Sequence, residues 1–185
     1  MARLHASGVP NDLMTQIGTD FLGNLFYRGL AASPHAIVLT IMDGETVAAF
    51  AAVALDMKRC LRQIVMSQPM MSVRYGFSHI LFQPKLWRPF IEAMRLNTPE
   101  QQQPAAEILM IATADAYRGR GLGVKLLSAI DDEMQRRGIK ACLARVREDN
   151  IHAIRMYEIC GYREIGSITF NNSHWKWLAH EVLEI

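Results

Sequence analysis

A glycine-rich turn in the second half of the chain limits the available folds more than any other feature of the sequence. Gly119, Gly121 and Gly123 alternate with other residues in this turn. It joins an apolar run at 106–113, which predicts a buried strand, to an amphipathic run at 121–137, which predicts a helix. Amides in the first turn of a helix have no partners within the helix, and glycines leave them open to approach. The turn therefore predicts a cradle for a phosphate or another anion.

The spacing of these glycines separates the turn from two common phosphate-binding loops. A dinucleotide-binding loop carries Gly-x-Gly-x-x-Gly, whereas this chain has Gly-x-Gly-x-Gly. An ATP-binding loop continues as Gly-Lys followed by Ser or Thr, whereas Gly123 precedes Val124 and Lys125. Arg118 and Arg120 add positive charge, which favours a pyrophosphate ligand. An ordinary glycine-rich turn stays open as an alternative.

The remaining hydrophobic pattern predicts a mixed sheet covered by helices. In the first half, a helical pattern follows Pro10, and Asp43-Gly44 joins two strand patterns as a hairpin. In the second half, strand and helix patterns alternate before two final strand patterns. The further elements expected are strands at 36–42, 46–55, 139–146, 162–170 and 174–182 and a helix at 150–160. This order of elements indicates the α/β class.

Two motifs in the second half carry a resemblance to a known family. The first is Tyr-Arg-Gly-Arg-Gly-Leu-Gly at 117–123, in which Arg118, Gly121 and Gly123 match the pattern Arg/Gln-x-x-Gly-x-Gly/Ala. The second, at 150–162, matches Asn-x-x-Ala-x-x-x-Tyr-x-x-x-Gly-Phe/Tyr. In this order and spacing, the motifs resemble the acetyl-CoA signature of the GNAT superfamily of N-acetyltransferases.

The resemblance implies a fold and a domain organisation. It covers 106–165, and the helix and hairpin of the first half agree in type with the family. We therefore expect one GNAT-like domain over 1–185, with a central mixed, mostly antiparallel sheet of about six to seven strands flanked by helices. The stretch 57–104 is not covered, and we expect it to be a variable insert on the acceptor side.

The resemblance also implies that acetyl-CoA is the acyl donor. Amides of 118–123 would bind the pyrophosphate, and the backbone of 111–113 would pair with the pantetheine arm as an added strand does. An amide near Ile111 would polarise the thioester carbonyl. The acetyl-CoA contacts expected are Ile111, Ala112, Thr113, Arg118, Gly119, Arg120, Gly121, Leu122, Gly123, Asn150 and Tyr157. No metal is expected, because the His and Cys residues lack ligand spacing.

Three residues have an implied role beside an alternative structural one. Tyr157 matches the family tyrosine that protonates the departing thiolate, or it is a core aromatic. Glu107 occupies the position at which one branch of the family carries its general base, or it is a surface residue at a strand start. Asn150 contacts the pantetheine or only caps a helix. Further candidate bases, which no spacing distinguishes, are His79, His152 and His174.

The acceptor is expected to be a primary amine that attacks directly within a ternary complex. The stretch 57–104 holds seven basic and two acidic residues. It is either solvated helix surface or a positively charged wall that favours an anionic small molecule, such as a nucleotide-linked amino sugar, through Arg59, Arg62 and Arg88. A protein N-terminal or lysine acetyltransferase is an alternative, as is a non-catalytic acyl-CoA-binding sensor.

Composition limits the partners and the location. A formal net charge of +2 does not indicate nucleic acid as the main partner. No apolar run approaches the roughly 20 residues that span a membrane, so a cytoplasmic protein without membrane contact is expected. Its three cysteines, an odd number without close pairs, indicate reduced thiols. Trp175 and Trp177 fall on one face of the last strand, which either pairs with a second subunit in a homodimer or covers the core.

Overall fold

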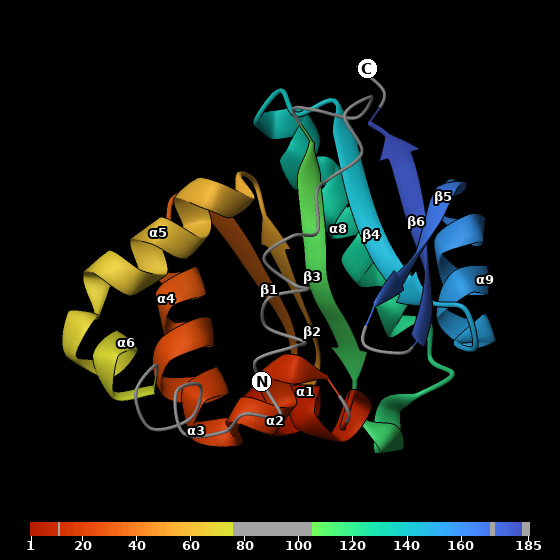
Figure 1. Cartoon of the computed structure of the whole chain (residues 1–185). Helices are drawn as coiled ribbons and strands as arrows, with labels where there is room; N and C mark the ends of the chain where they lie inside the picture. Colours follow the sequence, from red (N-terminus) through yellow and green to blue (C-terminus); the bar gives the residue numbers. More distant parts are fainter. Residues whose placement is uncertain (11, 76–104, 171–172, 183–185) are drawn as a thin grey trace.

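The computed structural model describes residues 1–10, 12–75, 105–170 and 173–182 (Figure 1). Within 57–104, the hydrophobic pattern predicts a short helix after Pro84 and the composition predicts a polar loop at 98–104, and both lie outside the described residues. Within the described ranges, no helix has the length and apolar character that a membrane span requires.

A six-stranded sheet in the order β1-β2-β3-β4-β6-β5 organises the described part of the chain. Neighbouring strands are antiparallel except for β3 and β4, which are parallel. The strands are β1 (Ala36–Asp43), β2 (Thr46–Ala54), β3 (Ala106–Thr113), β4 (Ala141–Arg147), β5 (Arg163–Phe170) and β6 (Ser173–Glu181). The expected α/β fold with a mixed, mostly antiparallel sheet is confirmed.

Helices cover both faces of this sheet (Figure 1). Helices α8 (Leu122–Arg136) and α9 (Ile151–Ile159) pack on one face, and the N-terminal helices pack on the opposite face of β1 to β3. The other helices are α1 (Ala2–Gly8), α2 (Leu13–Ile17), α3 (Thr19–Phe21), the π-helix η1 (Leu22–Tyr27), α4 (Arg28–Ala31), α5 (Met57–Ser67), α6 (Pro69–Tyr75) and the 3-10 helix η4 (Asp115–Tyr117).

Strand β2 lies between the two helical layers and is buried on both sides. Ala49, Ala51 and Val53 belong to the hydrophobic cluster under α8 and α9, whereas Phe50 and Ala52 belong to the cluster under the N-terminal helices. Successive side chains of a strand point to opposite faces, so the continuous apolar run of this segment buries both. The sheet therefore separates an α8–α9 side from an N-terminal side.

The second half of the chain follows its predicted elements closely. Strand β3 spans the predicted 106–113, and α8 and α9 lie within the predicted ranges. Gly138 (φ 65°) and Gly161 (φ 83°) follow the ends of α8 and α9 in the left-handed region, which glycine adopts without strain. A glycine directly after an amphipathic run predicts such a helix end from the sequence, and the structure confirms it at both positions.

The first half is more broken than its pattern suggests. The helical segment after Pro10 is interrupted at Gly18, whose φ of 129° and ψ of 156° are not helical. Its first piece is capped by Asp12, whose carboxylate accepts from the Met14 amide at 3.0 Å. The pattern did not predict α1, α5 or α6. In α5 only Cys60 and Ile64 are buried, which leaves a short apolar stripe.

The last strand is interior rather than an edge. Strand β6 pairs with β4 on one side and β5 on the other, so β5 forms the edge of the sheet. Trp177 is buried in a small cluster with Leu143 and Ala179. Of the two roles considered for the final strands, covering the core therefore has support, and a homodimer stays a prediction.

Candidate active site

The parallel strands β3 and β4 separate partway along their length and form a fork in the sheet. Only Ala106–Ile108 of β3 pair with β4, and their partners there are Cys142–Ala144. Beyond that point, β3 stays paired with β2 as far as Thr113, and β4 stays paired with β6 as far as Arg147. The facing edges of the two strands are therefore unpaired with each other, and an extended chain can hydrogen-bond to such an edge.

A β-bulge marks the start of the fork. Val53 pairs with Ile108 and Ala52 pairs with Met110, so Leu109 is an extra residue opposite β2. A bulge bends its strand and increases the local twist. The bulge coincides with the point at which β3 ceases to pair with β4, whose own pairing with β6 continues without a register shift.

The glycine-rich turn lies between the open end of β3 and α8. Gly119 (φ 73°) and Gly121 (φ 71°) are in the left-handed region, and a Cβ built at either meets no atom within 4 Å. Gly121 is the N-cap of α8, and no side chain in the described part of the chain caps its first-turn amides. The turn is thus open, and its amides are available to an anion.

Arg118 and Arg120 flank these amides at the surface. Arg118 Nη2 lies 2.8 Å from Asp115 Oδ1, and the Arg120 guanidinium lies 5.1 Å from the centre of the Tyr117 ring. The Tyr117 hydroxyl donates to Asp43 Oδ2 at 2.7 Å, a bond that raises the Tyr117 pKa. These contacts hold the turn against the β1–β2 hairpin.

Gly123 has a different role from the two glycines before it. A Cβ built on Gly123 overlaps the Met156 sulfur of α9. The glycine therefore permits close packing between the first turn of α8 and α9, and its contact with the pyrophosphate stays a prediction. Leu122 beside it packs against the cluster under α8 and α9.

Tyr157 lies on the α8–α9 side of the fork. Its side chain is 6% exposed and belongs to the same hydrophobic cluster as Val146 of β4, with Ile111 of β3 packed against that cluster. Burial raises the pKa of Tyr157, because a phenolate would lose its hydration. The phenol is therefore protonated at neutral pH.

Glu107 lies on the opposite side of the sheet, in a polar cluster at the base of the fork. It is 6% exposed, and Arg145 of β4 contacts one of its oxygens, Oε1, through Nε at 2.7 Å and Nη2 at 2.6 Å. The Arg145 guanidinium lies 5.2 Å from the centre of the Trp177 ring. Glu107 is thus a buried ion-pair partner and not a surface residue.

The other predicted contacts have varied surroundings. Asn150 caps α9, because its Oδ1 accepts from the Ala153 amide at 3.1 Å. Ala112 faces the N-terminal side, while Ile111 faces the α8–α9 side. Thr113 pairs with Ala49 at the end of β3. Most of the predicted residues therefore surround the fork, and their contacts with acetyl-CoA stay predictions.

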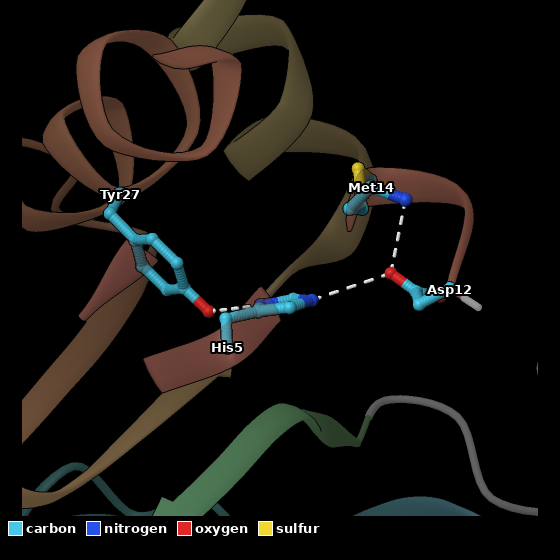
Figure 2. A network of polar contacts seen from close by, with 4 residues as sticks. All are labelled: His5, Asp12, Met14 and Tyr27. Carbon is cyan, nitrogen blue, oxygen red and sulfur yellow. Dashed lines mark hydrogen bonds and ion pairs between the residues drawn. The ribbon is translucent and has the colours of Figure 1, made fainter. Parts of the chain in front are cut away.

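A buried histidine that the sequence did not single out lies on the N-terminal side (Figure 2). His5 is 4% exposed, its Nδ1 lies 2.5 Å from the Tyr27 hydroxyl, and its Nε2 lies 3.4 Å from Asp12 Oδ2. Figure 2 shows this network joining α1, η1 and the start of α2. Leu109 and Met110 of β3 pack against the cluster that contains Tyr27, so the network joins the N-terminal helices next to the β3 side of the fork.

The basic residues considered for the acceptor lie elsewhere. Arg59 and Arg62 are exposed on α5, which contacts α4 and lies beyond β1 in Figure 1, away from the fork between β3 and β4. Arg59 Nε is 3.4 Å from Asp56 Oδ2. Arg88 lies outside the described residues.

Known proteins share both the sequence pattern and the fold. Over 59 residues the chain is 37% identical to the [ribosomal protein bS18]-alanine N-acetyltransferase of Escherichia coli (strain K12), a match that covers 32% of this chain and 40% of that protein. Over 58 residues it is 36% identical to the spermine/spermidine N(1)-acetyltransferase of Bacillus subtilis (strain 168), covering 31% and 38% of the two. The matches therefore span less than half the length of these curated relatives.

Structural similarity extends over the whole chain. The solved structure of a putative acetyltransferase from Salmonella typhimurium with its cofactor acetyl-CoA superposes with a TM-score of 0.60 and 14% identity, covering 100% of this chain and 87% of that one. At this identity the likeness concerns the fold. The acetyltransferase (GNAT) family matches residues 16–162, and the chain therefore belongs to that family.

Proposed function

We propose that this chain is an acetyl-CoA-dependent N-acetyltransferase that transfers an acetyl group directly to a primary amine. The observation that carries the proposal is the fork between β3 and β4 beside the open, glycine-lined start of α8. Acetyl-CoA supplies an activated acetyl thioester. The residues of the fork bind it, orient it and move protons around it.

The turn at 118–123 binds the pyrophosphate. Its amides stand at the positive end of α8, a helix long enough to have a substantial dipole. Left-handed Gly119 and Gly121 keep the approach free of side chains. Arg118 and Arg120 add positive charge at the surface, where phosphates that remain in solvent can reach them.

The free edge of β3 holds the pantetheine arm. Backbone groups of Ile111, Ala112 and Thr113 lie past the last residues paired with β4, so they can bond an extended ligand as a further strand would. An amide near Ile111 donates to the thioester carbonyl and stabilises the negative charge that develops there.

Tyr157 acts as the general acid. Its neutral phenol donates a proton to the sulfur as the bond between sulfur and the acetyl carbon breaks, which avoids release of a free thiolate. The raised pKa of Tyr157 keeps this proton in place across the physiological range. Its position in the cluster that borders both β3 and β4 supports this role.

Glu107 acts as the general base from the other side of the sheet. Both contacts from Arg145 end on Oε1, and in the described part of the chain no ion pair or hydrogen bond to Oε2 accompanies them. Oε2 accepts a proton from the amine, directly or through water, as the new bond between nitrogen and carbon forms. The charge-assisted bond from Arg145 fixes the direction of the carboxylate.

The acceptor is a primary amine of a small molecule or of a protein N-terminus. One relative is named for the alanine of a ribosomal protein and the other for polyamines, so family membership supports both classes. An anionic small molecule bound through Arg59 and Arg62 is less well supported, because α5 lies away from the fork. Replacing both arginines by glutamine should therefore leave KM unchanged at low and high salt.

Thiol release from acetyl-CoA tests the proposed activity. We would follow it across polyamines, amino sugars and their nucleotide conjugates, amino acids and short peptides with a free N-terminus. Fast release with one class establishes the enzyme and its acceptor class together. Silence across the panel, with acetyl-CoA still raising the melting temperature, indicates a sensor or an untested acceptor. Silence without that rise contradicts the coenzyme assignment.

A further inference from the structure

Side chains from α8 and β6 meet the end of α9 behind Tyr157. His180 of β6 pairs with Cys142 of β4, and Cys142 belongs to the cluster under α8 and α9, so the imidazole faces these helices. His180 Nε2 lies 3.6 Å from Asp131 Oδ2 of α8. The two residues therefore join α8 to the sheet at the end of the cluster that contains Tyr157.

The Asp131 carboxylate depends on His180 for compensation. Its Oδ1 is buried and has no hydrogen-bond partner within the described ranges, whereas Oδ2 faces the imidazole. Burial raises the pKa of Asp131, and the charge of His180 opposes that rise. The side chains are 22% and 20% exposed, so water screens the pair only in part. Asp131 thus restricts the orientation of the His180 ring.

The ring of His180 covers the end of α9. A Cβ built on Gly161 would lie 3.1 Å from His180 Cε1 and 3.2 Å from Nδ1, closer than most such contacts allow. The imidazole also stacks on the Tyr162 ring, with centroids 5.1 Å apart and planes inclined by 27°. Gly161 is therefore needed both for its φ of 83° and for the space that the imidazole occupies.

Tyr162 transmits this contact to Tyr157. The Tyr162 amide donates to the Tyr157 carbonyl at 3.0 Å, and the two rings meet edge to face with centroids 5.1 Å apart. Tyr162 is 2% exposed, so it has little room to move independently. A displacement of the His180 ring therefore shifts Tyr162, and with it the phenol of Tyr157.

We propose that Asp131 and His180 are positioning residues for Tyr157: Asp131 fixes the imidazole, and the imidazole fixes the Gly161-Tyr162 end of α9. The inference rests on the proposed role of Tyr157 as the acid in acetyl transfer. Neither residue touches the reacting atoms, and both act on the direction of one hydroxyl. Misplacing a reacting group by about 1 Å can cost on the order of a hundredfold in rate.

The test compares His180→Ala in the natural chain and in a Tyr157→Phe chain, with kcat and KM measured by thiol release using spermidine and an alanine-initiated peptide. We expect His180→Ala to lower kcat about tenfold, with KM for acetyl-CoA changed less than about twofold. In the Tyr157→Phe chain it should lower kcat no further, because the positioned hydroxyl is gone. The double variant His180→Phe/Asp131→Asn has an aromatic ring at position 180 and no unpaired carboxylate at position 131. It should therefore recover most of the kcat that His180→Ala loses.

Melting temperatures are measured on every variant, and Asp131→Asn replaces His180→Ala if the latter does not fold. A loss of kcat that is the same with and without the Tyr157 hydroxyl would show general structural damage and overturn the inference. An unchanged kcat for His180→Ala and Asp131→Asn would also overturn it. If Tyr157→Phe alone leaves kcat intact, the acid role itself is wrong, and the positioning inference falls with it for that separate reason.

Discussion

Replacing Glu107 by glutamine separates the two roles that its surroundings allow. Glutamine keeps an oxygen for Arg145 but cannot accept a proton from an amine. Hydrogen bonds to a charged group contribute roughly 1.5–3 kcal/mol and neutral ones roughly 0.5–1.5 kcal/mol, so the substitution should lower the free energy of unfolding by about 1–1.5 kcal/mol. The side chains of Glu107 and Arg145 are 8% and 29% exposed, so water screens the pair only in part and the loss should lie within that range.

The expected loss of rate is larger than this loss of stability. General-base catalysis contributes about 10²- to 10⁴-fold, so kcat/KM should fall at least about a hundredfold in Glu107→Gln. Arg145→Gln is the matched control, because it removes the same ion pair and leaves the carboxylate present. Because it leaves a buried carboxylate without its partner, it should lower the melting temperature at least as much, while kcat/KM falls by about tenfold or less.

The assay is thiol release under conditions in which circular dichroism shows both variants to be folded. Urea denaturation gives the free energy of unfolding for each. If Glu107→Gln loses no more activity than Arg145→Gln, Glu107 serves only as the partner of Arg145, and the base is another group.

Two single contacts and two buried side chains give four further expected outcomes. Asn150→Ala removes the cap of α9 and should lower the free energy of unfolding by about 1 kcal/mol in urea denaturation, whereas Asn150→Asp should retain most of it. Gly123→Ala should destabilise the chain by about 1–3 kcal/mol through overlap with Met156, and adding Met156→Ala should relieve most of that loss. Burial raises the pKa of Tyr157, and a general acid must be protonated to act. As the pH is raised, kcat should therefore not decrease at pH values below about 10, the ordinary pKa of tyrosine. A decrease in kcat near pH 8 that Tyr157→Phe abolishes would contradict this prediction. Burial raises the pKa of Cys142 to about 12, so iodoacetamide at pH 8 should not label it in the native protein but should do so in urea; rapid native labelling would show that the thiol is accessible.

The elements of the second half could be predicted because their signals are local. The apolar run of β3, the periodicity of α8 and the glycines after α8 and α9 each act over a few residues. The hairpin at Asp43-Gly44 is of the same kind. The first half has weaker local signals, since Gly18 divides its helical pattern and α1 carries few apolar residues.

The surroundings of the site depend on contacts that are distant in sequence. Arg145 lies 38 positions after Glu107, and Tyr27 lies 22 positions after His5. Neither pair has a spacing that marks it before the chain folds. The separation of β3 from β4 is likewise a property of strand pairing, which no local pattern in the sequence marks. Gly123 matched the family signature, but its packing against Met156 becomes visible only in three dimensions.

Two matched glycines test most directly whether the glycine-lined start of α8 binds coenzyme A. Gly121 (φ 71°) and Gly138 (φ 65°) flank the same helix, and a Cβ at either meets open space. An alanine in the left-handed region costs roughly 1–2 kcal/mol, so both alanine variants should lose similar stability. Calorimetric titration with coenzyme A should show affinity at least about tenfold weaker for Gly121→Ala and unchanged for Gly138→Ala. Equal affinity in both variants, or no binding by the unaltered chain, would contradict the account.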